Sequence, residues 1–356
     1  MINISLCMIV KNESDILRRC LDSYKSIADE IIIIDTGSTD NTKEIAGEYT
    51  DKIYDYVWED DFAKARNFAF SKASCDYIFS ADADEMLDTA NQLALLQLKS
   101  VLLPEIDIVQ MKYVNCIKGN SVYNSRKELR PKLFKRLRTF EWISPIHETI
   151  RLNPVVFDSD IEIMHMPQQS HSKRDFNTFV KALDKGVRLE NYVVTMFCKE
   201  LWSTGDEEDF RELLPVYEKY MTTYTDESCF KEVSCILARM YRLAGAGMKD
   251  AFFKVVLKQV ADNPPSEICL ELGNYYLSLE DYEEAVLWYI NAAYETQPVL
   301  DIHAGGDTPL KQLAICYDML SHSMNDAGDT EATETYNGLA NDYRQQADNW
   351  TLPEEL

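Results

Sequence analysis

Four consecutive isoleucines, Ile31–Ile34, constrain the fold of this chain more than any other feature of its 356 residues. Only a strand that is covered on both faces buries four successive apolar side chains, and such strands are typical of parallel sheets with helices on both sides. The turn DTGSTDN follows, and a helical pattern begins near Asn41. We therefore predict a strand, a turn and a helix, which is the repeating unit of an α/β domain.

The same alternation of strands and helices continues on either side of the isoleucines. Residues 3–10 have the pattern of a buried strand, and residues 16–27 carry apolar side chains at helical spacing behind Asn12, which we expect to cap that helix. The segments DKIYDYVW and CDYIFSAD are predicted strands that flank a helix over residues 61–74. This order predicts a mainly parallel sheet with its ligand site at the carboxyl ends of the strands.

The pattern changes near residue 176 to almost continuous helix. Four segments share a helix–turn–helix outline, and their anchor residues, spaced by 36, 35 and 41 positions, are Leu201, Leu237, Leu272 and Leu313. The third segment is close to the tetratricopeptide pattern, whose period is about 34 residues. Stacked repeats of this kind bury a continuous core and leave a concave surface for a partner. We predict two domains, residues 1–175 and 176–356, with an irregular helical bundle as the alternative architecture of the second.

Composition narrows the range of partners. There are 36 Lys and Arg against 60 Asp and Glu, and the net charge of −24 disfavours general binding to nucleic acid or to an anionic membrane. The exception is the basic run of residues 126–138, with seven cations and one acid. This run would steer a diphosphate or hold an anionic acceptor, or it is a solvated strand edge. Nine cysteines without a CxxC pair indicate reduced thiols and a cytoplasmic protein, and no stretch reaches the ~20 apolar residues of a transmembrane helix.

The stretch CDYIFSADADEMLD concentrates acids directly after a predicted strand. Asp82, Asp84, Glu85 and Asp88 lie within seven residues, and crowded carboxylates raise each other's pKa unless a cation or a hydrogen-bonding ligand lies among them. A D-x-D turn holds two carboxylates close enough to bind a hard divalent cation such as Mg²⁺ or Mn²⁺, which also binds phosphate oxygens. Most D-x-D turns are solvated turns or helix caps, so the metal hypothesis depends on the neighbouring motifs.

Two further segments carry candidate ligand-binding residues. Asp35 ends the isoleucine strand at the same edge of the sheet, where it would accept a hydrogen bond from a nucleobase ring N–H; the alternative is a plain turn aspartate. Arg66, in WEDDFAKARNFAF, would reach a base or a diphosphate; the alternative is an ion pair with Asp60 or Asp61. The sequence contains neither GxxxxGK[ST] nor GxGxxG, which excludes the P-loop and Rossmann fingerprints.

Four motifs within the first 85 residues resemble the nucleotide-binding half of GT-A fold glycosyltransferases of family 2: ISLCMIVKNE, IIIIDTGSTDNT, DDFAKARNFA and FSADADE. With the later IHE, the chain is similar to lipopolysaccharide core transferases and to bacterial protein glycosyltransferases with appended tetratricopeptide repeats, including the sublancin-type S-glycosyltransferases. The resemblance covers residues 3–172. It implies a GT-A nucleotide-sugar-binding α/β domain with a mainly parallel sheet, followed by an all-α tetratricopeptide-like helical repeat domain.

The resemblance also implies roles for individual residues. Asp35 would contact the uracil of a UDP-sugar, and the segment near Glu13 would line the same nucleoside pocket. Arg66 would face the base or the diphosphate. Asp82 would lie against ribose and metal, and Asp84 would be the main ligand of Mn²⁺ or Mg²⁺. In this interpretation the ion neutralises the crowded acids and offsets the charge of the leaving UDP.

An inverting sugar transfer also needs a base that takes a proton from the acceptor. Glu148 in FEWISPIHETI lies where the family places its acceptor-side loop and is the expected base, although Ser144-Pro145 stands where the family pattern often has glycine. The alternative is an ordinary strand-end glutamate. Some related enzymes complete the metal site with a late histidine; His165 is the expected third ligand, and His147 is the competing candidate.

These inferences predict one function and leave two alternatives. We expect an inverting, metal-dependent glycosyltransferase that moves a hexose or N-acetylhexosamine from UDP-glucose or UDP-N-acetylglucosamine to a Ser, Thr or Cys side chain of a peptide or protein. The helical domain would recruit the acceptor or form a homodimer. The alternatives are a transferase that acts on a glycan or lipopolysaccharide core, and a repeat scaffold without catalytic activity. A chain that had lost activity need not keep all the candidate acids, which disfavours the scaffold.

Overall fold

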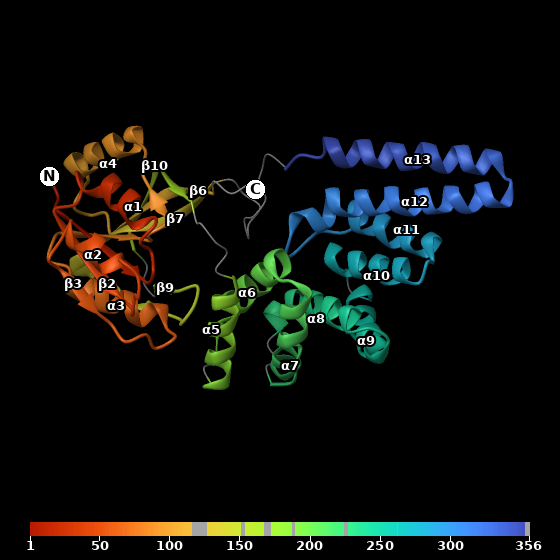
Figure 1. Ribbon diagram of the computed structural model, residues 1–356, viewed down its shortest axis with the longest axis horizontal. Coiled ribbons are helices and arrows are strands. Elements are labelled where there is room, and N and C mark those ends of the chain that lie inside the picture. The colour runs from red at the N-terminus through yellow and green to blue at the C-terminus, as the bar shows by residue number, and fades with distance from the viewer. Residues whose placement is uncertain are drawn as a thin grey trace. The chain divides into compact units, whose positions relative to one another are not determined.

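The computed structural model describes residues 1–115, 127–150, 154–166, 172–186, 189–223, 227–261 and 263–352. The chain divides into two compact units, of which the first ends at Leu189 and the second begins at Glu190 (Figure 1). The domain boundary expected between residues 175 and 176 stays a prediction. No helix of the described ranges is long and apolar enough to cross a membrane.

An eight-stranded sheet of the described residues forms the centre of the first unit, in the order β3-β2-β1-β4-β7-β6-β10-β5. Four neighbouring strands are parallel: β1 Ile4–Val10, β2 Glu30–Asp35, β3 Ile53–Asp55 and β4 Tyr77–Ala81. Two strands of the other half, β6 Ile108–Asn115 and β10 Val156–His165, are also parallel to each other. The antiparallel members are β7 Lys127–Lys135 and the short β5 Glu85–Met86. The prediction of a mainly parallel α/β sheet is confirmed.

Helices cover both faces of this sheet, as the four isoleucines require (Figure 1). One apolar core joins the sheet to α1 Leu17–Tyr24, α2 Thr42–Gly47 and α4 Thr89–Val101, and a second core on the opposite face joins it to α3 Phe62–Lys72. Ile33 packs in the first core, whereas Ile32 and Ile34 pack in the second, and all three side chains are fully buried. The run of isoleucines is therefore a strand buried on both faces.

Asn12 does not cap the first helix, so that prediction is wrong. α1 starts at Leu17 after Ile16, without a side-chain cap. Asn12 instead adopts a left-handed backbone conformation, with φ of 57°, and its Oδ1 accepts a hydrogen bond from the backbone N–H of Thr39 at 2.7 Å. The side chain is used to join the loop after β1 to the loop after β2.

The basic run is an internal strand and not a solvated sheet edge. β7 lies between β4 and β6 and pairs antiparallel with both. It is followed by a short 3₁₀ turn, Arg136–Arg138, and by a small two-stranded sheet of β8 Trp142–Ile143 and β9 Thr149–Ile150. The first unit ends with α5 Ser172–Asp184. Arg126, the first residue of the run, lies outside the described residues.

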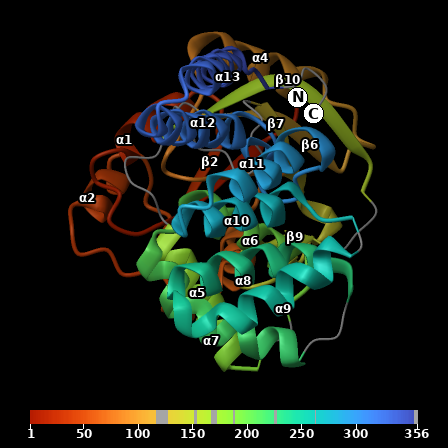
Figure 2. The same ribbon diagram turned by 90° about the vertical axis from the view of Figure 1, so that its right-hand side faces the viewer.

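The second unit is helical throughout its described elements, and its helices follow one another as four pairs: α6 Asn191–Thr204 with α7 Glu207–Thr223, α8 Phe230–Ala244 with α9 Lys249–Val260, α10 Ser266–Ser278 with α11 Tyr282–Ile290, and α12 Asp307–Ala327 with α13 Thr330–Asn349. Figure 2 shows the later pairs stacked in chain order. Each predicted anchor is at most 2% exposed: Leu201, Leu237, Leu272 and Leu313. The helix–turn–helix segments and the all-α class of this half are confirmed.

Two contacts show how the helices of the second unit are joined. Only glycine fits at position 273 on α10, because a Cβ there would lie 2.5 Å from the ring of Tyr289 on α11. The fully buried Glu271 on α10 binds Arg239 on α8 at 2.9 Å, and Arg242 on the same helix binds its other oxygen. Helices α10 and α11 are therefore in close contact, and a compensated buried charge joins the second pair to the third.

Candidate functional site

Three parallel strands of the first unit end at one edge of the sheet. Val10 at the end of β1 is in register with Asp35 at the end of β2, and Met8 is in register with Ala81 at the end of β4. Asp35 and the acids that follow Ala81 therefore lie on either side of β1, at the carboxyl edge where doubly wound sheets bind their ligands.

Asp35 is 1% exposed and uses its two oxygens differently. Its Oδ1 accepts hydrogen bonds from the backbone N–H groups of Gly37 at 3.0 Å and Ser38 at 2.9 Å, a turn that Gly37 permits with φ of 99°. Its Oδ2 is buried and has no hydrogen-bond partner among the described residues. The side chain thus shapes the turn and retains one oxygen that can accept a donor.

The loop that carries Glu13 is held against the loop that follows Asp35. The backbone N–H of Glu13 donates to Thr42 Oγ1 at 2.7 Å, and that of Ser14 donates to Asp40 Oδ2 at 3.1 Å. Burial acts to raise the pKa of Asp40, but its hydrogen bonds from Thr42 and Ser14 outweigh burial and lower it to about 2. Glu13 and Asp35, far apart in sequence, are therefore brought to one rim of the sheet.

Each of the four crowded acids has its own partner in the protein. Asp82 Oδ1 lies 3.7 Å from Arg66, Asp84 Oδ2 lies 3.1 Å from His165 Nε2, and Glu85 forms an ion pair with Lys132. Asp88 caps α4 by accepting a hydrogen bond from the backbone N–H of Asn91 at 2.8 Å. Protein cations and a helix cap therefore offset much of the repulsion that the sequence led us to attribute to a metal.

His165 reaches Asp84 because of a strand too short to be recognised in the sequence. β5, only two residues long, pairs antiparallel with the end of β10 and places His165 opposite Glu85. The backbone N–H of Met166 also donates to the carbonyl oxygen of Asp84 at 2.9 Å. Two predicted ligands that are 81 residues apart in sequence are thus neighbours.

Asp84 and His165 provide only part of a metal site. Asp84 Oδ1 is buried without a hydrogen-bond partner among the described residues, so one carboxylate oxygen remains for a cation. Within the described ranges no group of three His, Cys, Asp or Glu side chains gathers closely enough to share an ion. Asp82, the other expected ligand, lies beside Arg66, and its side chain is 46% exposed.

Arg66 and Glu148 form a nearly buried ion pair. The Nε of Arg66 donates to Glu148 Oε1 at 2.8 Å, a second guanidinium nitrogen donates to Ser80 Oγ, and each of the paired side chains is 13% exposed. The guanidinium also lies 5.0 Å from the ring centroid of Trp142. Burial acts to lower the pKa of Arg66, but Glu148 and Asp82 outweigh burial and raise it. The predicted base is therefore held by a permanent cation.

The alternative partners predicted for Arg66 are engaged elsewhere. Asp60 binds Lys181 at 2.8 Å, and Asp61 caps α3 by accepting a hydrogen bond from the backbone N–H of Lys64 at 3.0 Å. The alternative of an ion pair between Arg66 and Asp60 or Asp61 is wrong, because α3 directs Arg66 into the unit, toward Ser80 and Asp82.

Lys132, Arg130 and Tyr113, which the sequence did not single out individually, surround the acid cluster. Glu85 is fully buried, and its partner Lys132 on β7 is 6% exposed. Tyr113 on β6 packs between cations and the histidine: the Arg130 guanidinium lies 3.8 Å and the His165 ring 5.0 Å from its ring centroid. The sequence signal for these cations was the alternation of Arg130 and Lys132 in the basic run. A cation on the buried face of an internal strand requires a buried acceptor.

The pKa values of two of the acids, Asp82 and Glu85, are shifted in opposite directions. Burial acts to raise the pKa of Asp82, but the charges of Arg66, Lys132, His165 and Arg130 outweigh burial and hold it below its ordinary value. Burial raises the pKa of Glu85, and the neighbouring charges of Asp82 and Asp84 act in the same direction against Lys132. The negative charge is thus favoured on Asp82 and disfavoured on Glu85.

Part of the first unit matches a known protein family. Residues 5–162 match the family described as "Glycosyl transferase family 2", a range that includes Asp35, Arg66, Asp82, Asp84 and Glu148. The matched range lies within the first unit and contains its strand-end acids. The match covers less than half of the chain, so it identifies a family 2 glycosyltransferase domain within the first unit.

Individual relatives match shorter segments. A TPR repeat-containing protein of Synechococcus elongatus is 49% identical over 87 residues, which are 24% of this chain and 22% of that protein. The SPbeta prophage-derived glycosyltransferase SunS of Bacillus subtilis is 32% identical over 126 residues, which are 35% of this chain and 30% of that protein. The chain thus spans less than a third of the length of these curated relatives.

Solved structures give a weaker likeness. TarS 1-349 of S. aureus is 13% identical with a TM-score of 0.37, covering 82% of this chain and 91% of that chain. Glucosyl-3-phosphoglycerate synthase of Mycobacterium tuberculosis, in complex with Mn²⁺ and UDP-glucose, is 14% identical with a TM-score of 0.38, covering 53% of this chain and 81% of that chain.

Proposed function

We propose that this chain is an inverting, metal-dependent glycosyltransferase that moves a hexose or N-acetylhexosamine from a UDP-sugar to a peptide or protein side chain. The observation that carries the proposal is the convergence of Arg66, Asp82, Asp84, Glu148 and His165 at the carboxyl edge of the sheet. These residues come from α3, the turn after β4, the loop before β9 and the end of β10. Two of the contacts that join them, Arg66–Glu148 and Asp84–His165, span 82 and 81 positions of sequence, so the fold and not the local sequence brings these residues together.

Asp84 and His165 supply the donor atoms expected of a divalent metal site. Asp84 offers a buried carboxylate oxygen without a hydrogen-bond partner among the described residues, and His165 Nε2 lies 3.1 Å from the other oxygen of the same carboxylate. An oxygen donor suits both Mg²⁺ and Mn²⁺, and an imidazole donor favours Mn²⁺. When bound, such an ion would neutralise the negative charge that develops on the diphosphate of the leaving UDP.

The nucleotide half of the donor would be held by the residues around β1 and β2. Asp35 Oδ2 would accept the ring N–H of uracil, and the loop of Glu13 would line the nucleoside. Arg130, whose side chain is 42% exposed above Tyr113, is the cation of the basic run that would face the diphosphate. The three positions supply an acceptor for the base and a positive charge for the phosphates.

Glu148 would take the proton of the acceptor, and Arg66 would fix its orientation. A thiol, with an ordinary pKa of about 8.5, needs less assistance from a base than a hydroxyl does. The acceptor side chain would be a Ser, a Thr or a Cys.

The helical unit would recruit the acceptor or join two copies of the chain. Its stacked pairs offer an extended surface, as repeat arrays do. A cytoplasmic location is supported by the described cysteines, all of which are free thiols.

The first experiment measures UDP release from a panel of nucleotide sugars, with Mn²⁺, with Mg²⁺ and with EDTA. We expect wild type to release UDP from UDP-glucose or UDP-N-acetylglucosamine only with metal, and Asp84→Asn to lose this activity while keeping its circular dichroism. The matched control is Asp318→Asn, which removes the charge of an exposed ion pair in the second unit. This variant should release UDP at the wild-type rate. Full activity of Asp84→Asn would remove the metal assignment.

The base assignment is tested separately with Glu148→Gln. The variant should bind UDP as wild type does by calorimetry, and should transfer sugar to a Cys-containing acceptor peptide about 10²–10⁴-fold more slowly. Transfer to a glycan but not to any peptide would favour the glycan or lipopolysaccharide-core alternative. If the wild type neither binds UDP nor releases it, the chain is the inactive repeat scaffold.

A further inference from the structure

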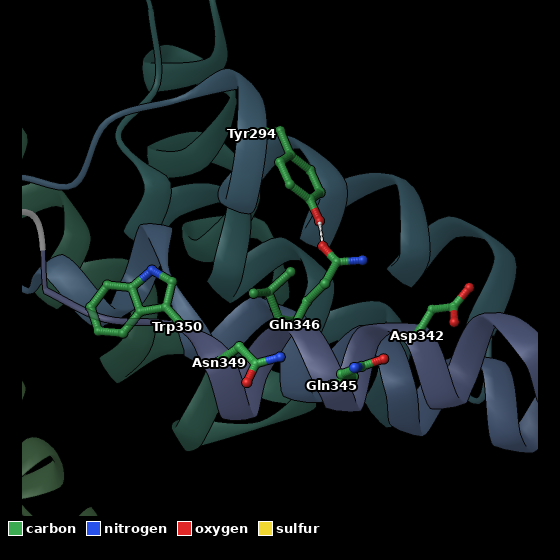
Figure 3. A pocket seen from close by; sticks show the side chains of 7 residues that line it. Tyr294, Asp342, Gln345, Gln346, Asn349 and Trp350 are labelled. Atoms are coloured by element: carbon green, nitrogen blue, oxygen red, sulfur yellow. Dashed lines mark hydrogen bonds between the residues drawn. The ribbon is translucent and has the colours of Figure 1, made fainter.

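The last helical pair of the second unit has a hollow of about 530 Å³ on its surface (Figure 3). This volume lies within the range of roughly 300–1,000 Å³ that is typical of small-molecule sites. Its lining comes from three elements: Tyr294 follows α11, Leu310 is on α12, and the remaining side chains, on or directly after α13, are Asp342, Gln345, Gln346, Asn349 and Trp350. The site is independent of the transferase residues, all of which belong to the first unit.

One face of α13 supplies the polar side of the hollow. Asp342, Gln345, Gln346 and Asn349 are spaced at i, i+3, i+4 and i+7, which places them on the same face of a helix. Three of the four are amides, and each amide carries both a donor and an acceptor. A row of this kind matches a ligand that presents several hydroxyl groups, since each hydroxyl also donates and accepts.

Two aromatic rings border this polar face, Trp350 at one end and Tyr294 next to Gln346 (Figure 3). Trp350 packs against Gly306 so closely that a Cβ there would lie 2.5 Å from the indole, and its ring centroid is 5.0 Å from that of His303. Tyr294 donates a hydrogen bond from its hydroxyl to Gln346 Oε1 at 2.8 Å. Both rings are thus positioned by contacts already present, which reduces the entropy lost on binding.

The charge of the lining discriminates among ligand classes. Of the seven described residues that form it, none is a cation, and Asp342 adds one negative charge. The carbonyl end of α13 at Asn349 adds a partial negative charge. Phosphates, nucleotides and carboxylates are disfavoured by this field. Leu310 is the single aliphatic side chain of the lining.

We propose that this hollow is a binding site for a neutral saccharide. A pyranose ring presents C–H groups with partial positive charge on its faces, which are attracted to the negative faces of Trp and Tyr rings. It presents hydroxyl groups around its edge, which the amides of α13 and Asp342 are placed to bind. The combination of two aromatic rings, three amides and one carboxylate without a cation fits this class of ligand and disfavours an anionic one.

The test is a titration of the full chain with maltotriose and with triacetylchitotriose, followed by saturation-transfer NMR and calorimetry. We expect one of the two to bind with a Kd on the order of 1 mM. Tyr294→Ala and Asn349→Ala should each weaken binding about tenfold. Both side chains are exposed, Tyr294 by 53%, so these substitutions spare the packed Trp350.

Two controls separate this site from the transferase site. Asn337→Ala changes an exposed amide of the same helix outside the hollow and should leave the affinity unchanged. Asp84→Asn should also leave it unchanged, because the saccharide binds in the other unit. The proposal is overturned if neither oligosaccharide binds, if Tyr294→Ala and Asn349→Ala bind as wild type does, or if Asp84→Asn abolishes binding. A signal seen only with phosphorylated sugars or with peptides would also overturn it.

Discussion

Replacing Lys132 by Met would leave Glu85 as an uncompensated charge in the interior of the first unit. Glu85 is fully buried, and the side chain of Lys132 is 8% exposed. Removing one partner of a buried ion pair typically costs about 3–5 kcal/mol, because the remaining charge keeps its desolvation penalty. We therefore expect Lys132→Met to lower the free energy of unfolding of the first unit by about 3 kcal/mol at pH 7.5.

The size of this loss should depend on pH. The pKa of Glu85 is already raised, so its folded-state pKa lies above that of the unfolded chain, and it rises further without Lys132. A group of this kind favours folding below its unfolded pKa, and that contribution is lost as pH rises through the folded pKa. The deficit of Lys132→Met should therefore be largest at pH 7–8 and shrink by about 1.4 kcal/mol for each pH unit over which Glu85 takes up its proton.

Urea unfolding followed by circular dichroism measures this deficit. Two units can unfold in two transitions, so the transition that Lys132→Met displaces is the one compared at each pH. The double variant Lys132→Met with Glu85→Gln removes both charges and should recover stability to within about 1 kcal/mol of wild type. A deficit that is the same at pH 5 and pH 8, or a double variant as unstable as the single one, would refute the reasoning.

Three further expectations concern stability. Gly273→Ala should cost about 1–3 kcal/mol in urea unfolding, since the new Cβ meets the ring of Tyr289 at 2.5 Å. Gly37→Ala should cost about 1 kcal/mol from its backbone alone, because φ is 99° with no atom near the Cβ position; an unchanged midpoint would contradict this. Burial opposes ionisation of Glu30, but Lys52 and its other donors hold its pKa at about 2. Glu30→Gln should therefore lower the free energy of unfolding by on the order of 3 kcal/mol at pH 7. The difference from wild type should vanish near pH 2, where Glu30 takes up its proton.

The parts of the fold that the sequence predicted are those determined by local patterns. Ile31–Ile34 required a strand covered on both faces, and the buried anchors Leu201 and Leu313 followed from helical spacing. The D-x-D turn was recognisable because Asp82 directly follows an apolar strand. In each of these cases neighbours in sequence determine the environment of the residue.

The remaining features depend on pairings that no local pattern specifies. β5 is two residues long, so the pairing that brings His165 to Asp84 leaves no periodic signal. Arg66 and Glu148 are 82 residues apart, and only the fold shows that they share an ion pair. Asn12 had the sequence features of a helix cap, but the loop after β2 offered its side chain a competing backbone donor, Thr39.

Two acids at the carboxyl edge of the sheet use their carboxylate oxygens in the same way. Asp35 and Asp84 each engage one carboxylate oxygen within the protein and bury the other without a partner among the described residues. The engaged oxygen fixes the rotamer, so binding a ligand requires little further ordering. The second oxygen is desolvated without a compensating bond, which destabilises the free protein and is relieved when a donor or a cation arrives. The same arrangement destabilises the free protein and supports our proposal that Asp35 accepts a nucleobase N–H and that Asp84 binds a metal ion.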